Sequence, residues 1–141
     1  MSLNQTVYED TIGKFVWDPE AKVMFHTYND DSQFATDEEF KEHLIKFGEK
    51  ILEYKPVGII EDYKTMKFVA GVELLEWIGK ELKPKLVQAG VKRYAKLVSE
   101  DYISQLMAEQ VVEEARQKNP GAIPDGTFLT LEEALEWAKK V

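Results

Sequence analysis

The chain has 141 residues, of which 44% are hydrophobic and 31% charged, as expected of one globular domain with its own core. It contains no cysteine, which excludes disulfides, thiol catalysis and thiolate metal sites and fits a reducing compartment. The net charge of −8 disfavours nucleic acid as a partner, and no apolar run approaches the roughly 20 residues that a membrane span needs. We therefore expect a cytoplasmic protein with no nucleic-acid partner and no membrane span.

The first elements predict a β-hairpin. Residues 6–17 favour strand, Asp18-Pro19-Glu20-Ala21 forms a turn, and residues 23–28 form the return strand. Along the return strand, alternate residues point to opposite faces, and both faces are largely apolar. The face that carries Met24, His26 and Tyr28 offers a surface for a partner to cover. Because symmetric dimers are the commonest oligomers, we predict a homodimer.

A helix follows the hairpin. Thr36 and Glu39 have the spacing of a capping box, in which each side chain accepts a hydrogen bond from the other residue's backbone amide. The helix ends near Tyr54, because Pro56 disfavours helical geometry in the residue before it. Its buried face is predicted from apolar residues at spacings of three and four, namely Phe40, Leu44, Phe47 and Ile51.

The stretch from Pro56 to Trp77 is the centre of the predicted fold. An apolar run at residues 57–60 predicts a buried strand, residues 61–65 a polar loop, and the following residues a helix that packs back on the sheet. Pro84 predicts a kink or a break in that helix, which stops at Gly90. Its predicted apolar side comprises Phe68, Val72, Leu75 and Leu82, with Leu74 and Ile78 beside it.

The remainder predicts two more strands and two more helices. Residues 92–98 form a strand, Ser99 caps a helix with an apolar stripe at Ile103, Met107 and Val111, and residues 127–129 form a short edge strand. Thr130 and Glu133 repeat the capping box before a last helix that buries Leu131, Ala134, Leu135 and Ala138. The predicted class is α/β. A single domain, residues 1–141, has a mixed sheet of about five strands that opens with a β-hairpin, the rest parallel with helical crossovers.

This pattern resembles small bacterial proteins of the STAS-like type, which are related in fold to anti-sigma-factor antagonists and to CRAL-TRIO domains. The resemblance is carried by the opening hairpin and by the segments EEFKEHLIKFGEKILEYKP, GIIEDYKTM, QAGVKRYAKLVSED and FLTLEEALEWAKK. It implies a regulatory or ligand-binding role without enzymatic activity. The antagonists are switched by phosphorylation of a serine at the start of the helix after the central strand. Phe68-Val69-Ala70-Gly71 occupies that region here and has no hydroxyl, so the switching function does not carry over.

Two histidines are the natural candidates for general bases or metal ligands, because they titrate near neutrality. His26 lies mid-strand on an otherwise apolar face and is predicted to be structural. His43 lies beside Phe40, Leu44 and Phe47 and is predicted to be a partly exposed boundary residue. Because the two have no metal-binding spacing such as HExxH, no metal and no cofactor are predicted.

Two functions from different classes follow. Adjacent strand residues point to opposite faces, so Glu61 and Asp62 do not form a carboxylate pair by themselves. Asp62 at the strand end either acts as a base or bonds the amides of its loop. The prediction is a non-enzymatic module that binds a small apolar or anionic ligand or a protein partner. The alternative is a small hydrolase or isomerase that uses Asp62 with His26.

A ligand is predicted at the loop after the central strand. A helix start near Thr65 offers unpaired amides that favour an anion, whereas the start near Ser99 already carries Glu100 and Asp101. In the predicted site Thr65 donates a hydrogen bond, the two lysines attract the ligand, and Tyr63 forms an aromatic wall. Its residues are Asp62, Tyr63, Lys64, Thr65 and Lys67.

Overall fold

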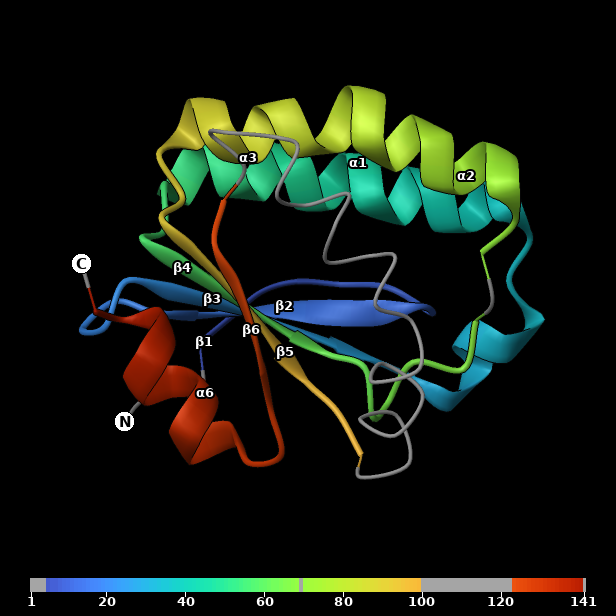
Figure 1. Cartoon of the computed structure of the whole chain (residues 1–141). Helices are drawn as coiled ribbons and strands as arrows, with labels where there is room; N and C mark the ends of the chain where they lie inside the picture. The colour runs from blue at the N-terminus through green and yellow to red at the C-terminus, as the bar shows by residue number, and fades with distance from the viewer. Residues whose placement is uncertain (1–4, 69, 100–122, 141) are drawn as a thin grey trace.

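The computed structural model describes residues 5–68, 70–99 and 123–140. They form a six-stranded mixed sheet in which the spatial order of the strands equals their order in the chain (Figure 1). The first three strands pair antiparallel and the last three follow in parallel, which confirms the predicted α/β class. The strands are β1 (Gln5–Glu9), β2 (Gly13–Asp18), β3 (Val23–Tyr28), β4 (Gly58–Asp62), β5 (Arg93–Leu97) and β6 (Asp125–Phe128).

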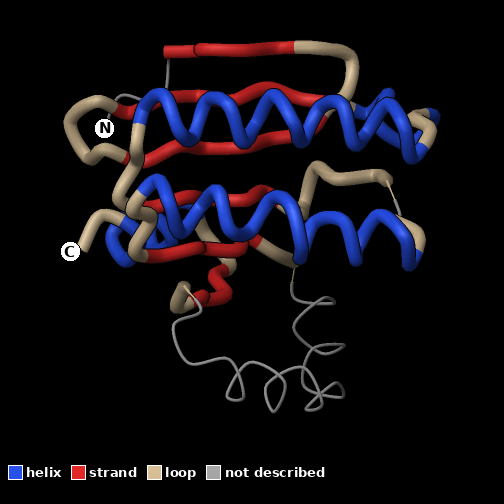
Figure 2. The backbone as a smooth tube through the Cα atoms, turned by 90° about the horizontal axis from the view of Figure 1, so that it is seen from above, coloured by secondary structure: helices blue, strands red, loops and turns tan. Residues whose placement is uncertain are grey.

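Helices cover both faces of the sheet. The long helix α1 (Asp37–Tyr54) lies beside a second rod built from α2 (Val72–Trp77), the π-helical segment η2 (Ile78–Leu82) and α3 (Lys83–Ala89) (Figure 2). The short 3₁₀ helix η1 (Asp30–Phe34) precedes α1, and α6 (Leu131–Ala138) lies on the opposite face (Figure 1). The described residues therefore form three layers with the sheet in the middle.

Each face of the sheet has its own apolar core. The larger core lies under α1 and α3, and its fully buried members include Phe15, Met24, Ile51 and Ile59. The smaller core lies under α6, where Val23, Ile60 and Ala95 of the sheet meet Ala134, Leu135 and Ala138. Alternation along β4 thus sends Ile59 and Glu61 to the α1 face and Ile60 and Asp62 to the α6 face.

The stretch predicted as one strand over residues 6–17 forms two. A tight turn separates β1 from β2, and the Asp10 carboxylate accepts the amides of Ile12 and Gly13 at 2.9 and 3.1 Å. Gly13 is required at this point, because a Cβ there would lie 2.3 Å from the Thr27 carbonyl oxygen. Asp10 and Gly13 are therefore the turn signal within an otherwise strand-like run.

The helix after β4 differs from its prediction in start and in face. The predicted apolar side was wrong for Val72 and Leu75, which are 72% and 58% exposed, whereas Leu74 and Leu82 face the core. The π-helical segment η2 changes the angular period of the rod, so one 3.6-residue pattern does not run through it. The rod does not break at Pro84, because η2 passes directly into α3 and Pro84 lies in the first turn of α3. Gly90 ends the rod with a φ of 87°, as predicted.

In both predicted capping boxes the threonine hydroxyl accepts the amide three residues later. Thr36 and Glu39 form the complete capping box of α1. At α6 the Thr130 hydroxyl accepts the Glu133 amide at 3.3 Å. Ala134, Leu135 and Ala138 are buried as predicted, and Leu131 is half-buried. The helix predicted after Ser99 lies outside the described residues.

Candidate functional site: a buried histidine–carboxylate network

The site begins with a pair of residues on neighbouring strands. The parallel register of β3 and β4 sets His26 opposite Glu61 on the face that α1 covers. The His26 Nδ1 atom lies 2.9 and 3.1 Å from the two carboxylate oxygens of Glu61. Both side chains are removed from solvent, with His26 at 0% and Glu61 at 4% exposure.

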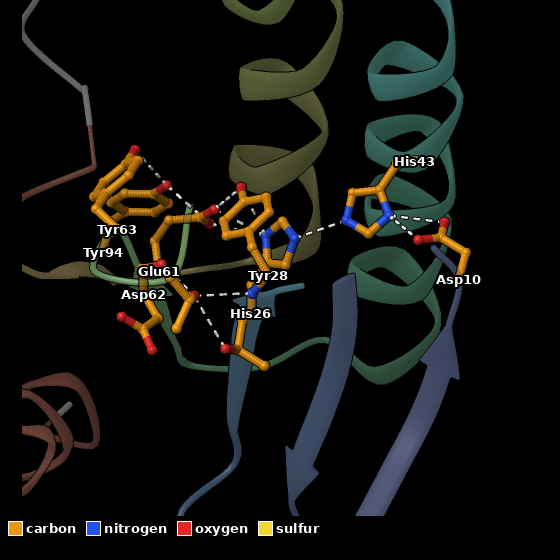
Figure 3. Close-up of polar contacts among 10 residues, drawn as sticks. Asp10, His26, Tyr28, His43, Glu61, Asp62, Tyr63 and Tyr94 are labelled. Atoms are coloured by element: carbon orange, nitrogen blue, oxygen red, sulfur yellow. Dashed lines mark hydrogen bonds and ion pairs between the residues drawn. The ribbon is translucent and has the colours of Figure 1, made fainter. Parts of the chain in front are cut away.

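Helix α1 contributes the second imidazole. His43 lies between Phe40 and Phe47 on the buried side of the helix, which points its ring at the sheet. Its Nε2 atom is 2.8 Å from Nε2 of His26, and its Nδ1 atom is 2.8 and 2.9 Å from the carboxylate oxygens of Asp10. Asp10, His43, His26 and Glu61 thus form one continuous hydrogen-bonded chain (Figure 3).

Tyrosines complete the network at both carboxylates. The Tyr28 hydroxyl donates to one oxygen of Glu61, and the Tyr94 hydroxyl donates to the other at 3.1 Å. The Tyr63 hydroxyl lies 3.4 Å from that of Tyr94 (Figure 3). At the other end, the Tyr8 hydroxyl donates to Asp10 at 2.9 Å. Every carboxylate of the network therefore accepts hydrogen bonds from more than one side.

Aromatic rings enclose the two imidazoles. Phe47 stacks on His26 with ring centroids 4.7 Å apart, and Phe15 meets both His26 and His43 at 5.0 Å. Both phenylalanines belong to the larger core and are 2% exposed or less. The histidine pair therefore lies in an apolar, low-dielectric setting, where hydrogen bonds between its members are electrostatically strong.

The surroundings change the acidity of each member. Burial alone would raise the pKa of Glu61, but the charge of His26 and hydrogen bonds from His26, Tyr28 and Tyr94 lower it below its ordinary value. For Asp10, burial is likewise outweighed by the bond to His43 and by backbone amides, so its pKa is also lowered. Both carboxyl groups are therefore ionised at neutral pH.

The other members shift upward or downward for similar reasons. Burial and the charge of His26 lower the pKa of His43, and Asp10 only partly opposes this effect. Burial, followed by the charge of Glu61, raises the pKa of Tyr28 and Tyr94 well above the ordinary value. Burial and the bond to Asp10 raise the pKa of Tyr8 to about 12. The tyrosines therefore act in the network as neutral donors.

The structure brings His26 to Glu61 rather than to Asp62. Asp62 is on the α6 face, where its carboxylate accepts the Lys64 amide at 3.0 Å, and burial raises its pKa. The two residues of the hydrolase or isomerase alternative therefore lie on opposite faces of the sheet (Figure 3). The expectation that His43 is a partly exposed boundary residue was wrong, because the side chain is 1% exposed.

The loop predicted to hold a ligand is built around Thr65. Its hydroxyl donates to the Asp62 carbonyl oxygen, accepts the Tyr28 amide at 3.0 Å, and lies 3.2 Å from the Thr27 hydroxyl. The Lys64 ammonium donates a hydrogen bond to the Leu129 carbonyl oxygen at 2.7 Å. These contacts tie the loop to β3 and to the end of β6.

Other predicted features of this loop also find a place in the structure. Lys67 is exposed, and its amide donates to the Ser32 hydroxyl in η1. Tyr63 is half-buried against Tyr94. The helix expected to begin near Thr65 begins at Val72, so it does not bring its amides to Thr65.

The surface on which the dimer prediction rested is inside the chain. Met24, His26 and Tyr28 are at most 6% exposed, because α1 packs over them. Self-association stays a prediction, but this strand face no longer supports it. In the described parts of the chain, no set of three or more His, Asp or Glu side chains is arranged to hold a metal ion.

Comparison of the chain with protein-family models, curated proteins and solved structures gives no match. The STAS-like resemblance therefore stays a prediction from the arrangement of the elements. Among the helices of residues 5–68, 70–99 and 123–140, none combines the length and apolar character that a membrane span requires.

Proposed function

We propose that the chain is a non-enzymatic regulatory or ligand-binding module of STAS-like type, and that its main contact is with a protein partner. The contact surface lies at the carboxyl edge of the sheet, which is the edge where the parallel strands end. The observation that carries this proposal is an exposed apolar set at that edge, with Phe34 at 76%, Val72 at 72% and Leu75 at 58% exposure. Large exposed apolar side chains that gather in one region are typical of protein interaction sites.

Several contacts hold these residues at the same end of the molecule. Phe34 ends η1, which the amide of Lys67 joins to the loop after β4. Gly71, directly before Val72, lies close to the start of α1, since a Cβ there would be 3.3 Å from the Asp37 carboxylate. Leu75 follows Val72 by one turn, so both are on the same side of α2. Figure 1 shows η1 and the start of α2 at the same end of the sheet.

The environment of the histidines supports binding rather than catalysis. All four ring nitrogens of His26 and His43 have hydrogen-bond partners within the protein, and the aromatic core encloses both rings. A general base needs its nitrogen within about 3 Å of a substrate proton, or one water away. These nitrogens are instead used to join α1 to the sheet. Exposed Lys67 lies next to η1, whereas Asp30, Asp31 and Glu73 lie on the same elements as Phe34 and Val72, so charges of both signs surround the apolar set.

The proposal is tested by affinity capture with the wild-type chain and with Val72→Glu, each tagged and expressed in the source cells. Val87→Glu is the matched control, because Val87 is 55% exposed on α3 near the opposite end of the same rod. We expect quantitative mass spectrometry to find a protein retained by the wild type and by Val87→Glu, and lost from Val72→Glu. Circular dichroism checks that all three chains fold.

Two results would contradict the proposal. One is that Val72→Glu retains the same proteins as Val87→Glu, which places the contact elsewhere. The other is a hydrolase or isomerase activity of the purified chain that disappears in His26→Ala while the fold is intact. If the protein lost from Val72→Glu is the chain itself, sedimentation of both variants identifies the surface as a homodimer interface.

A further inference from the structure

The contact between the two imidazoles fixes the position of one proton. The Nε2 atoms of His26 and His43 are 2.8 Å apart, which is a hydrogen-bond distance. Two nitrogen lone pairs that face each other repel, and two N–H groups that face each other repel as well. A bond at this distance therefore requires one proton between the two nitrogens.

The opposite nitrogens also carry protons. Asp10 accepts the amides of Ile12 and Gly13 and the Tyr8 hydroxyl, so its carboxylate acts as an acceptor toward Nδ1 of His43. Glu61 accepts the hydroxyls of Tyr28 and Tyr94 and is an acceptor toward Nδ1 of His26 in the same way. Each Nδ1 atom is therefore a donor. Three of the four ring nitrogens hold a proton, whereas two neutral imidazoles hold two.

We infer that the His26–His43 pair is a proton-binding site that holds one extra proton, shared between α1 and the sheet. The positive charge of the pair lies between the carboxylates of Asp10 and Glu61, each 2.8 to 2.9 Å from an Nδ1 atom. Donation from Nε2 of His26 to Nε2 of His43 agrees with the lowered pKa of His43, which is caused by burial and by the charge of His26.

The groups that act on the pair come from every element around it. Tyr8 lies on β1, Asp10 follows it in the turn, Tyr28 is on β3, Glu61 on β4 and Tyr94 on β5. From β2 and α1 the pair meets the neutral rings of Phe15, Phe40 and Phe47. Two carboxylates thus oppose one positive charge, which leaves the network one unit negative.

The site makes the stability of the fold depend on pH in two directions. Unfolded histidines are both protonated well below pH 6.5 and both neutral well above it, whereas the folded pair as inferred holds one extra proton on either side of that pH. Below that pH the unfolded chain binds one proton more, so stability falls as the pH falls. Above it the folded chain binds one proton more, so stability falls as the pH rises. Each limb changes the folding equilibrium constant by up to about tenfold per pH unit.

The sequence makes this behaviour easy to assign. The chain has two histidines and no cysteine, so the α-amino group is the remaining group with an ordinary titration between pH 5 and 8. The first experiment is a two-bond nitrogen–proton correlation spectrum of ¹⁵N-histidine-labelled protein at pH 7. We expect chemical shifts for three protonated ring nitrogens and one unprotonated Nε2, or an average over the two Nε2 atoms. Two or four protonated nitrogens would overturn the inference.

The second experiment follows chemical unfolding from pH 5 to 9 in the wild type and in His43→Gln. The glutamine amide can donate to Nε2 of a neutral His26, so the variant does not need the extra proton. We expect the loss of stability above pH 7 in the wild type to vanish in His43→Gln. Glu42→Gln changes an exposed charge on the same helix and should keep both limbs. Equal alkaline limbs in all three chains would overturn the inference, and the wild-type spectrum decides the matter where His43→Gln does not fold.

Discussion

Removal of the Glu61 charge should lower the free energy of unfolding more than removal of any other single group in the described network. Glu61→Gln keeps the shape of the side chain but leaves the positive charge of the histidine pair with one carboxylate less. The amide nitrogen of the glutamine can also replace the Glu61 oxygen that accepts hydrogen bonds from the Tyr94 hydroxyl and the His26 ring. An N–H group at that place donates and cannot accept these bonds. Because removal of one partner from a buried ion pair costs about 3–5 kcal/mol, we expect a loss of that size in the free energy of unfolding.

Urea unfolding at pH 7, followed by tryptophan fluorescence and circular dichroism, measures this loss as a lower midpoint at unchanged slope. The matched control is Glu49→Gln, since Glu49 pairs with Lys46 at 3.5 Å on the exposed side of α1. Such a surface pair contributes about 0–1 kcal/mol, and the control should stay within that range. A loss of under about 1 kcal/mol in Glu61→Gln would refute the assignment of the network as a buried ionic system, because this size is typical of neutral hydrogen bonds.

Three further outcomes follow from the structure. Gly58→Ala should destabilise the chain by about 1–3 kcal/mol in the same unfolding assay, because the added Cβ would lie 2.3 Å from a backbone oxygen of α6. The control Gly79→Ala places its Cβ in open space and should leave the free energy of unfolding unchanged or raise it. Thr36→Ala should cost about 1 kcal/mol through loss of the α1 cap, and an unchanged midpoint would show that the capping box is dispensable. The pKa values of Asp10 and Glu61 are lowered in the folded chain, so these groups stabilise the fold at pH values above the ordinary carboxyl pKa, and this stability is lost as the pH falls below about 4. Near-ultraviolet circular dichroism should show the loss, and a signal unchanged down to pH 2 would contradict the prediction.

The fold was largely predictable because its signals are local. The capping box at Thr36 set the start of α1, and Gly90 set the end of α3. Apolar alternation and short runs identified β3 and β4. The split of the first strand was missed because the side chains of residues 6–17 favour strand throughout, and the turn depends on hydrogen bonds to Asp10. The outward face of α2 was missed because the π-helical segment that follows it has no strong sequence signal.

The network was less predictable because its contacts are long-range. His26 was expected on an apolar strand face, and the structure shows it buried there with the internal partners that such a polar residue needs. Its partners are 17 and 35 residues away, and sequence spacing does not show which strands pair or in what register. One signal was available for Glu61: it follows Ile59 at strand spacing and so shares the buried face. Asp62 was predicted as a candidate base because it lies at the strand end, but the structure places its side chain on the opposite face of the sheet from His26.

The network also explains how the sheet selects one register. A slip of one residue between β3 and β4 would exchange their faces, and the apolar pattern alone excludes it. A slip of two residues would keep Met24, Ile59 and the other apolar residues on the α1 side, so hydrophobic burial distinguishes it only weakly. That slip would set His26 opposite Ile59 and leave Glu61 without the imidazole, at the cost of two unpaired buried ionisable groups. The hydrogen bond from His26 to His43 extends the same selection to the position of α1, because a helix moved by one turn would remove His43 from the pair. The polar groups therefore select the register of β3 and β4 and the position of α1 where apolar packing alone does not. Because these groups are ionic, that selection depends on pH.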